Sequence, residues 1–197
     1  MKNHKFCIDN SKSGFSCARV FAIVIDDENF DLKYVLCILN SDLMKTYLQS
    51  FSSLKAGGYY SYSSNILNRV PIKNISLTEQ QPFIDLADKM LTLNADLQKS
   101  VQRFLKRVQD NLNPAKISST LESFYTIEFA DFVKELAKQK VKLSLKQQDE
   151  WEEYFAEYKK DCQAFAEEIA TTDNQINQLV YKLYDLTDEE IAVVEGR

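Results

Sequence analysis

The chain has 197 residues, of which 45% are hydrophobic and 27% charged, enough for one compact domain or one domain with an extension. Only four glycines and three prolines are present, and no run of about 18 apolar residues occurs, which excludes long disordered linkers and a membrane-spanning helix. The net charge of -5 disfavours a simple nucleic-acid binder, and four irregularly spaced cysteines with a single histidine, His4, disfavour a zinc site.

The first 75 residues are rich in β-forming residues and turns. Phe6–Ile8 is a short strand candidate and a turn follows it. Phe15–Ile25, FSCARVFAIVI, is β-branched and aromatic and is the best strand candidate of the chain. Leu32–Phe51 predicts a helix that is interrupted near Asn40, where Ser41 can cap the second segment.

A glycine turn and a polar aromatic cluster follow, between Lys55 and Asn65. The turn lets backbone approach a partner closely, and the neighbouring tyrosines and amides can stack and hydrogen-bond. This pattern favours recognition over catalysis, although an ordinary turn, packed tyrosines, a turn-capping asparagine and solvated lysines would give the same sequence. The residues predicted to contact DNA are Lys55, Gly57, Gly58, Tyr59, Tyr60, Tyr62, Ser64, Asn65, Arg69 and Lys73.

Residues 76–197 are predicted to be helical. Apolar residues step by four and three from Phe83 and again from Trp151, which predicts two long helices, about 78–112 and 145–184. Such helices pair most simply as an antiparallel hairpin. A helical connector at 117–141 and a short C-terminal helix complete this part. Asn94 and Thr172 interrupt the two apolar series, and single polar residues of this kind fix the register of paired helices. Three capping boxes are expected, at Thr78 with Gln81, Ser144 with Gln147, and Thr187 with Glu190.

The charge divides between these two parts. Residues 1–75 carry nine Lys and Arg against six Asp and Glu, whereas residues 76–197 carry fifteen against twenty-three. If DNA is bound, the first part is therefore expected to bind it. The basic excess is modest, so most phosphate contacts would have to come from elsewhere in a larger protein. The predicted fold class is α+β, with a β-containing recognition subdomain at 1–75 and the helical hairpin at 76–197.

No catalytic constellation is visible. The Glu157-Tyr158-Lys159 triplet matches the end of a nuclease motif but lies inside the helical pattern without a preceding P-D. The acidic run Asp26–Glu28 lacks the spacing of a calcium loop. The N-P-P-Y, D-P-P-F and F-x-G-x-G motifs of a DNA aminomethyltransferase are absent. The chain itself is therefore not expected to be an enzyme.

Two segments resemble the TaqI-like C-terminal specificity domain, the target recognition domain of type IIG and type IIS restriction-modification enzymes and of adenine-specific DNA methyltransferases. The first contains Leu39-Asn40-Ser41, Gly57-Gly58 and Val70-Pro71-Ile72-Lys73. The second is INQLVYKLYDLTDEEIAVVE, from Ile176 to Glu195, which is similar to a recurrent tail of that family. Two positions depart from the pattern: Asn177 replaces an aspartate, and Asp185 replaces a glycine at a helix end where a left-handed residue is wanted.

The resemblance implies that the chain recognises double-stranded DNA and positions a target adenine for N6 methylation. The methyltransferase domain, using S-adenosylmethionine, and any nuclease domain, using Mg2+, would belong to the same polypeptide, and no cofactor is expected in this chain. The start at Met1 would then truncate the recognition domain.

A prokaryotic cytoplasmic location is expected, because no signal peptide is visible and the cysteines read as reduced. No membrane contact is expected, and dimerisation is open. Two alternatives stand beside this interpretation. One is a type I specificity-subunit-like fragment whose helices measure the distance between two recognition domains. The other is a helical protein-interaction or dimerisation module.

Overall fold

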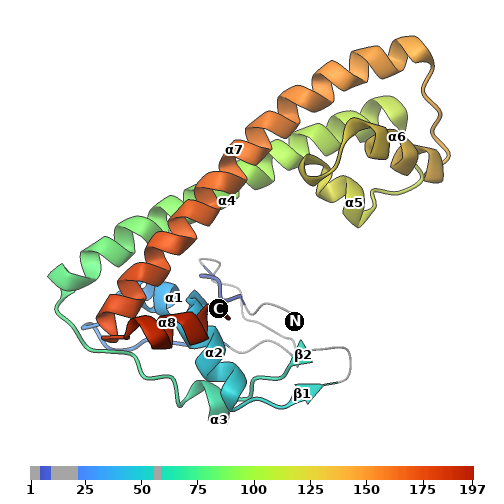
Figure 1. The fold of residues 1–197 in the computed structure, drawn as a ribbon. Helices are drawn as coiled ribbons and strands as arrows, with labels where there is room; N and C mark the ends of the chain where they lie inside the picture. Colours follow the sequence, from blue (N-terminus) through green and yellow to red (C-terminus); the bar gives the residue numbers. More distant parts are fainter. Residues whose placement is uncertain (1–4, 10–21, 56–58) are drawn as a thin grey trace. The chain divides into compact units, whose positions relative to one another are not determined.

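The structure is a computed structural model, which describes residues 5–9, 22–55 and 59–197. The chain forms two compact units (Figure 1). The first unit combines Met1–Lys89 with Thr172–Arg197, and the second is Met90–Thr171. The two longest helices, α4 (Leu77–Leu112) and α7 (Leu145–Leu183), each contribute residues to both units.

The prediction of an α+β fold is wrong, because the described residues are mostly helical. Their strand pairing is confined to β1 (Leu54–Lys55) and β2 (Tyr59–Tyr60), two residues each. Residues 22–25, the described end of the strongest strand candidate, form no strand, and the side chain of Val24 is 78% exposed. A β-branched run becomes a strand only where a partner and a packed face are available. Residues 10–21 and the predicted turn at Gly57-Gly58 lie outside the described residues.

The predicted interruption of the helix at Asn40-Ser41 is confirmed. The first helix is α1 (Leu32–Asn40), whose N-cap Asp31 accepts the backbone N–H of Lys33 at 2.7 Å. The second is α2 (Asp42–Ser50), whose N-cap Ser41 accepts the backbone N–H of Met44 at 3.2 Å. A short helix, α3 (Ser64–Leu67), follows the strand pair.

The first unit has its core between α1 and the beginning of α4. Tyr34 is fully buried and packs edge-on against Phe83, with 5.2 Å between the ring centroids. Gln80 is also fully buried, and its side chain accepts the N–H of Asp31 at 2.8 Å and donates to the carbonyls of Asn29 and Ile75. The last helix, α8 (Asp188–Val194), begins with the predicted capping box of Thr187 and Glu190, which is confirmed.

The second unit packs the end of α4 against the beginning of α7, with the connector on one side (Figure 1). The connector forms α5 (Ser119–Glu122), the 3-10 helix η1 (Phe124–Thr126) and α6 (Phe129–Lys138). Phe104 lies at the centre, stacked on Phe124 at 3.9 Å and edge-on to Phe155 at 6.0 Å. Within this unit the end of α4 thus packs against the beginning of α7, and helical segments lie between them in the sequence.

Two details of the predicted helices are corrected. The capping box of α4 is formed by Ser76 and Glu79, because Glu79 accepts from both the N–H and the hydroxyl of Ser76. Asn94 is exposed and Leu93 is buried in its place, whereas Thr172 is fully buried. A straight helix of 3.6 residues per turn drifts against a strict seven-residue repeat, which moves the buried position by one residue.

The capping box of Ser144 and Gln147 at the start of α7 is confirmed. No helix in the described ranges has the length and apolar character that a membrane crossing requires.

Candidate nucleic-acid interface

The predicted glycine turn is bracketed by the two short strands. They are antiparallel, with Leu54 opposite Tyr60 and Lys55 opposite Tyr59. The register brings the backbones of Lys55 and Tyr59 together on either side of residues 56–58. Leu54 is 64% exposed, so β1 presents an apolar side chain to solvent.

Two tyrosines of the polar aromatic cluster are half-buried and lie close to each other. Burial raises the pKa of Tyr62, and the charge of Tyr60 adds to this rise, so the two hydroxyls are within electrostatic reach. Neither Tyr60 nor Tyr62 is enclosed in the core. Their rings and hydroxyls are therefore placed where they can stack on a partner or donate to phosphate oxygens.

The helix α3 carries the next two candidates on its first turn. The side chains of Ser64 and Asn65 are both exposed. A carboxamide in this position offers a donor and an acceptor side by side, which is the pattern that pairs with the major-groove edge of adenine. The chain thus places an amide within a few residues of two accessible tyrosines.

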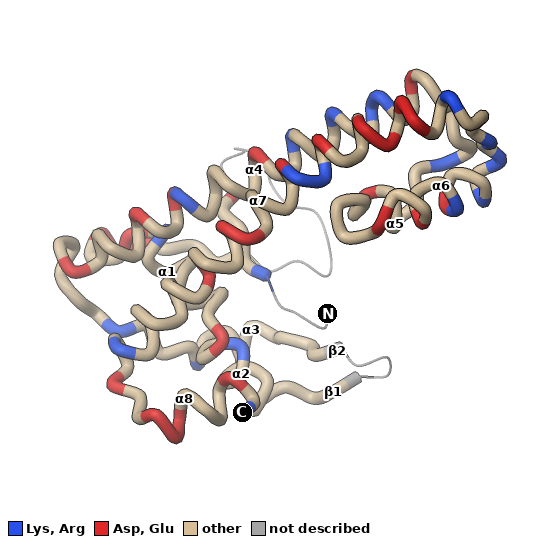
Figure 2. The backbone as a smooth tube through the Cα atoms, turned by 45° about the horizontal axis from the view of Figure 1, so that its top comes forward, with Lys and Arg blue, Asp and Glu red and all other residues tan. Residues whose placement is uncertain are grey.

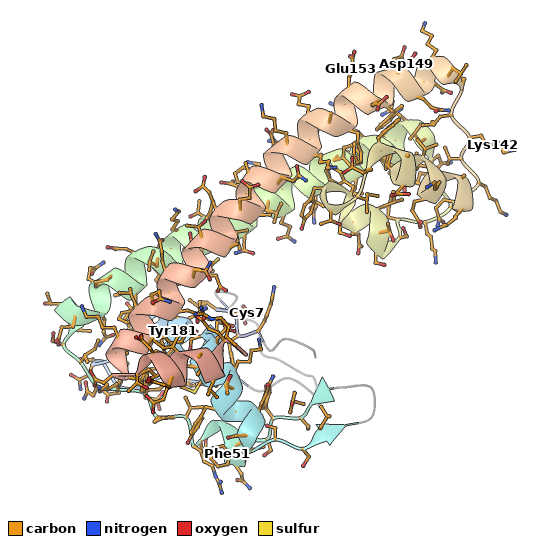
Figure 3. The ribbon with its side chains drawn as sticks, viewed as in Figure 1. Cys7, Phe51, Lys142, Asp149, Glu153 and Tyr181 are labelled. Atoms are coloured by element: carbon orange, nitrogen blue, oxygen red, sulfur yellow. The ribbon has the colours of Figure 1, made fainter. Side chains whose placement is uncertain are left out.

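Arg69 is exposed and lies over an aromatic ring. Its guanidinium carbon is 5.4 Å from the ring centroid of Phe51, which is itself 45% exposed at the end of α2 (Figure 3). Phe51 packs edge-on against Tyr47, with 5.0 Å between the centroids. The ring orients the guanidinium while its N–H groups remain accessible to an anion.

Three tyrosine hydroxyls hold the segment from Arg69 to Lys73 by its main chain. Tyr47 donates to the carbonyl of Arg69 at 3.1 Å, and Tyr34 donates to the carbonyl of Lys73 at 2.6 Å. Tyr184, at the end of α7, donates to the carbonyl of Pro71 between them. We call Tyr34, Tyr47 and Tyr184 the tyrosine clasp. The residues it holds alternate along the segment, and Pro71 has no N–H that would need a partner.

Two hydroxyls of the clasp, those of Tyr34 and Tyr184, are kept protonated by their surroundings. Burial raises the pKa of Tyr34 far above its ordinary value, and the charge of Tyr184 adds to the rise. Burial also raises the pKa of Tyr184. A protonated hydroxyl is the donor that a carbonyl requires, so these contacts persist throughout the neutral pH range.

Lys73 is placed differently from Arg69. Its ammonium donates to the carbonyl of Leu183 at 2.6 Å and to the carboxylate of Asp185 at 3.0 Å. Asp185 has φ +56°, which confirms the predicted left-handed residue at the end of α7. The charge of Lys73 therefore already has partners within the chain, at the C-terminal end of a helix where a cation is favourable.

The Leu39-Asn40-Ser41 motif has a structural explanation. Asn40 accepts the N–H of Phe6 at 2.9 Å and donates to the Phe6 carbonyl at 3.1 Å, so one amide holds the segment at 5–9. Ser41 caps α2, and the side chain of Asn177 accepts the N–H of Asp42, the first residue of that helix, at 2.8 Å. Asn177 also donates to the Asp42 carboxylate at 3.1 Å.

This pair explains one departure from the resembling family. An aspartate at position 177 would place a second carboxylate against that of Asp42. The sequence does not predict the contacts of the clasp tyrosines or of Asn177. Tyrosines at apolar helix positions signal that a hydroxyl needs a partner, but those carbonyls lie 22 to 113 residues away along the chain.

The described residues include no group of three or more His, Cys, Asp and Glu that could hold a metal ion. No curated protein and no solved structure matches the chain. Two family models do match it, and they follow one another along the sequence. The TaqI-like C-terminal specificity domain matches residues 2–72, and a Domain of unknown function (DUF8810) matches residues 76–180.

The first match includes every predicted DNA contact except Lys73, and most of the tail at 176–195 lies outside both matches. The second match covers more than half of the chain. The chain therefore belongs to the family of the Domain of unknown function (DUF8810) and carries a TaqI-like C-terminal specificity domain in front of it.

Proposed function

We propose that residues 1–75 read a base sequence in double-stranded DNA and position a target adenine for a methyltransferase of the same polypeptide. The observation that carries this proposal is the match to the TaqI-like specificity domain over residues 2–72, in which exposed polar side chains follow β2; they are Ser61, Ser63, Ser64 and Asn65. A specificity domain is not itself catalytic. S-adenosylmethionine, and Mg2+ where the parent enzyme also cuts DNA, would be bound by other domains.

The candidate residues divide by role. Asn65 would read an adenine edge, and Tyr60 and Tyr62 would stack or donate to the backbone. Arg69 would contact a phosphate from its place over Phe51. The remaining candidates are also proposed to contact DNA; they are Lys55, Gly57, Gly58, Tyr59 and Ser64. Lys73 would act at a distance, by fixing the segment that leads away from α3.

Rigid support favours this assignment. A recognition surface needs side chains held close to the productive geometry by contacts behind them. The tyrosine clasp supplies such contacts, because Tyr34 of α1, Tyr47 of α2 and Tyr184, which directly follows α7, fix one stretch of backbone. That stretch begins two residues after α3 ends at Leu67, so the hairpin and α3 would be anchored from their C-terminal side.

The test is selection of a duplex from a random-sequence pool by the full chain at low salt. The proposal expects enrichment of one motif. Asn65→Ala should relax at least one position of that motif, with a loss of roughly 10-fold or more in discrimination against the wrong base. The matched control is Asn68→Ala, which removes an exposed amide three residues away at the end of the same helix. Equal selection by wild type and Asn65→Ala, or no enrichment at all, would contradict the proposal.

A further inference from the structure

The second unit has a strongly uneven distribution of charge. Residues 132–148 carry five lysines and a single acidic residue, whereas the rest of the unit carries seven basic residues against thirteen acidic ones. Basic residues gather around the loop between α6 and α7 (Figure 2). A unit that is acidic elsewhere thus has one end suited to an anion.

Three of the five lysines are available for an external partner. Lys134 and Lys138 are paired with acids one turn away on α6, at 2.8 Å each. The other three, Lys140, Lys142 and Lys146, are exposed, and the structure gives them no ion pair with a described residue. We call Lys140, Lys142 and Lys146 the lysine cluster. Figure 3 shows the side chain of Lys142 on the loop between α6 and α7.

The backbone at Lys140 is unusual for a lysine. Lys140 has φ +66° and follows the C-cap of α6. Its N–H donates to the carbonyl of Ala137, and the next N–H, that of Val141, donates to the carbonyl of Leu136. This is the helix-ending pattern in which glycine is usual, because a side chain is strained at positive φ. A lysine therefore stands where the backbone alone would favour glycine, which points to a role for its side chain.

The beginning of α7 adds to the same imbalance. The positive end of a helix normally favours acidic residues in the first turn. Here the first turn has none, the cap is the neutral pair Ser144 and Gln147, and Lys146 is the second residue of the helix. Acidic residues begin beyond that turn, at Asp149 (Figure 3).

We propose that the lysine cluster is a second, sequence-independent DNA contact, which binds the phosphate backbone of duplex DNA. This rests on the proposed function only in taking DNA as the anion. The specificity part has a basic excess of only nine residues to six, so it needs phosphate contacts from outside itself. Lysines on flexible stems act as point charges and tolerate any register along a phosphate backbone, whereas planar recognition of carboxylates favours arginine.

The first experiment measures binding of the full chain to a duplex of arbitrary sequence as a function of salt. Each phosphate contact contributes about 0.9 to the slope of log K against log salt. The triple variant K140Q/K142Q/K146Q should therefore lower the slope by roughly 2 to 3. The matched control is K99Q/K106Q/K160Q, which removes the same charge from exposed positions on α4 and α7. Equal effects of the two triple variants, an unchanged slope, or no binding by the wild type would overturn the proposal.

A single substitution separates binding from folding. Lys140→Gly relieves the positive φ, so it should raise the thermal midpoint of unfolding while lowering the slope by about 0.9. A raised midpoint with an unchanged slope would overturn the role of Lys140. Stronger binding of polyglutamate than of duplex DNA would overturn the choice of partner.

The two proposals can fail separately. If a motif is enriched but the triple lysine variant leaves the salt slope unchanged, the proposal for residues 1–75 stands and the proposal for the lysine cluster is refuted. If the triple lysine variant lowers the salt slope but no motif is enriched, the proposal for residues 1–75 is refuted and the proposal for the lysine cluster stands.

Discussion

The contact between Asn177 and Asp42 gives a sharp test of how α7 is joined to α2. The perturbation is Asn177→Asp, which replaces the side-chain amide by a carboxylate and restores the aspartate of the recurrent tail described in the sequence analysis. The amide that donates to the Asp42 carboxylate at 3.1 Å becomes a second carboxylate, in a side chain that is only 5% exposed. The contact with the N–H of Asp42 survives, since either group can accept it.

The size of the effect follows from three contributions. A lost hydrogen bond to a charged group costs about 1.5–3 kcal/mol. Two like charges about 4 Å apart add up to about 4 kcal/mol at an effective dielectric constant of about 20. Lys45, whose ammonium is 3.4 Å from Asp42, and the positive end of α2 offset part of this. We expect Asn177→Asp to lower the free energy of unfolding by about 2–4 kcal/mol at pH 7.

The assay is denaturant unfolding followed by circular dichroism at pH 7 and pH 5. The deficit should shrink at the lower pH, because two adjacent carboxyl groups share a proton and the protonated one becomes a donor. Asn174→Asp is the matched control, since it adds the same charge on the exposed face of the same helix and should cost less than about 0.5 kcal/mol. Combining Asn177→Asp with Asp42→Asn exchanges donor and acceptor and should recover most of the loss. Equal stability of the two single aspartate variants would refute the reasoning.

Two further predictions concern the clasp and the second unit. Tyr34→Phe should lower the free energy of unfolding by about 1–2 kcal/mol, because it leaves the carbonyl of Lys73 without its donor. Tyr47→Phe, at a half-buried site, should lower it by less. Equal losses of stability in denaturant unfolding would argue against a special role for the buried hydroxyl of Tyr34. The hydrogen bond from Lys138 and then that from Ser118 lower the pKa of Glu135 below 4.5, so its contribution to stability is present above pH 4.5 and is lost as the pH falls through the lowered value. The decrease in denaturant midpoint caused by Glu135→Gln should therefore be complete at pH 7 and shrink steadily as the pH falls below 4.5. A decrease that does not depend on pH would contradict this assignment.

The sequence predicted the helices better than it predicted their contacts. The stepping of apolar residues located α4 and α7, and Ser41, Ser144 and Thr187 were recognised as caps because a cap and its partner lie within a few residues. Strand prediction failed at residues 22–25 because a strand depends on a partner elsewhere in the chain.

The candidate interface shows the same limit. The exposed amide and tyrosines could be named from composition, but the carbonyls held by the clasp could not, since a carbonyl is present at every residue and carries no sequence signal. The same holds for the partner of Asn177, because Asp42 lies 135 residues away along the chain.

The clasp has a consequence for how this protein can change. Its acceptors are main-chain carbonyls, so Tyr34, Tyr47 and Tyr184 hold the path of residues 69–73 whatever side chains that stretch carries. Substitutions at Asn65 or Arg69 remove none of these anchors. The side chains of the candidate interface can therefore be replaced without loss of the contacts that hold its main chain. New preferences for DNA sequence could be selected by randomising these side chains alone.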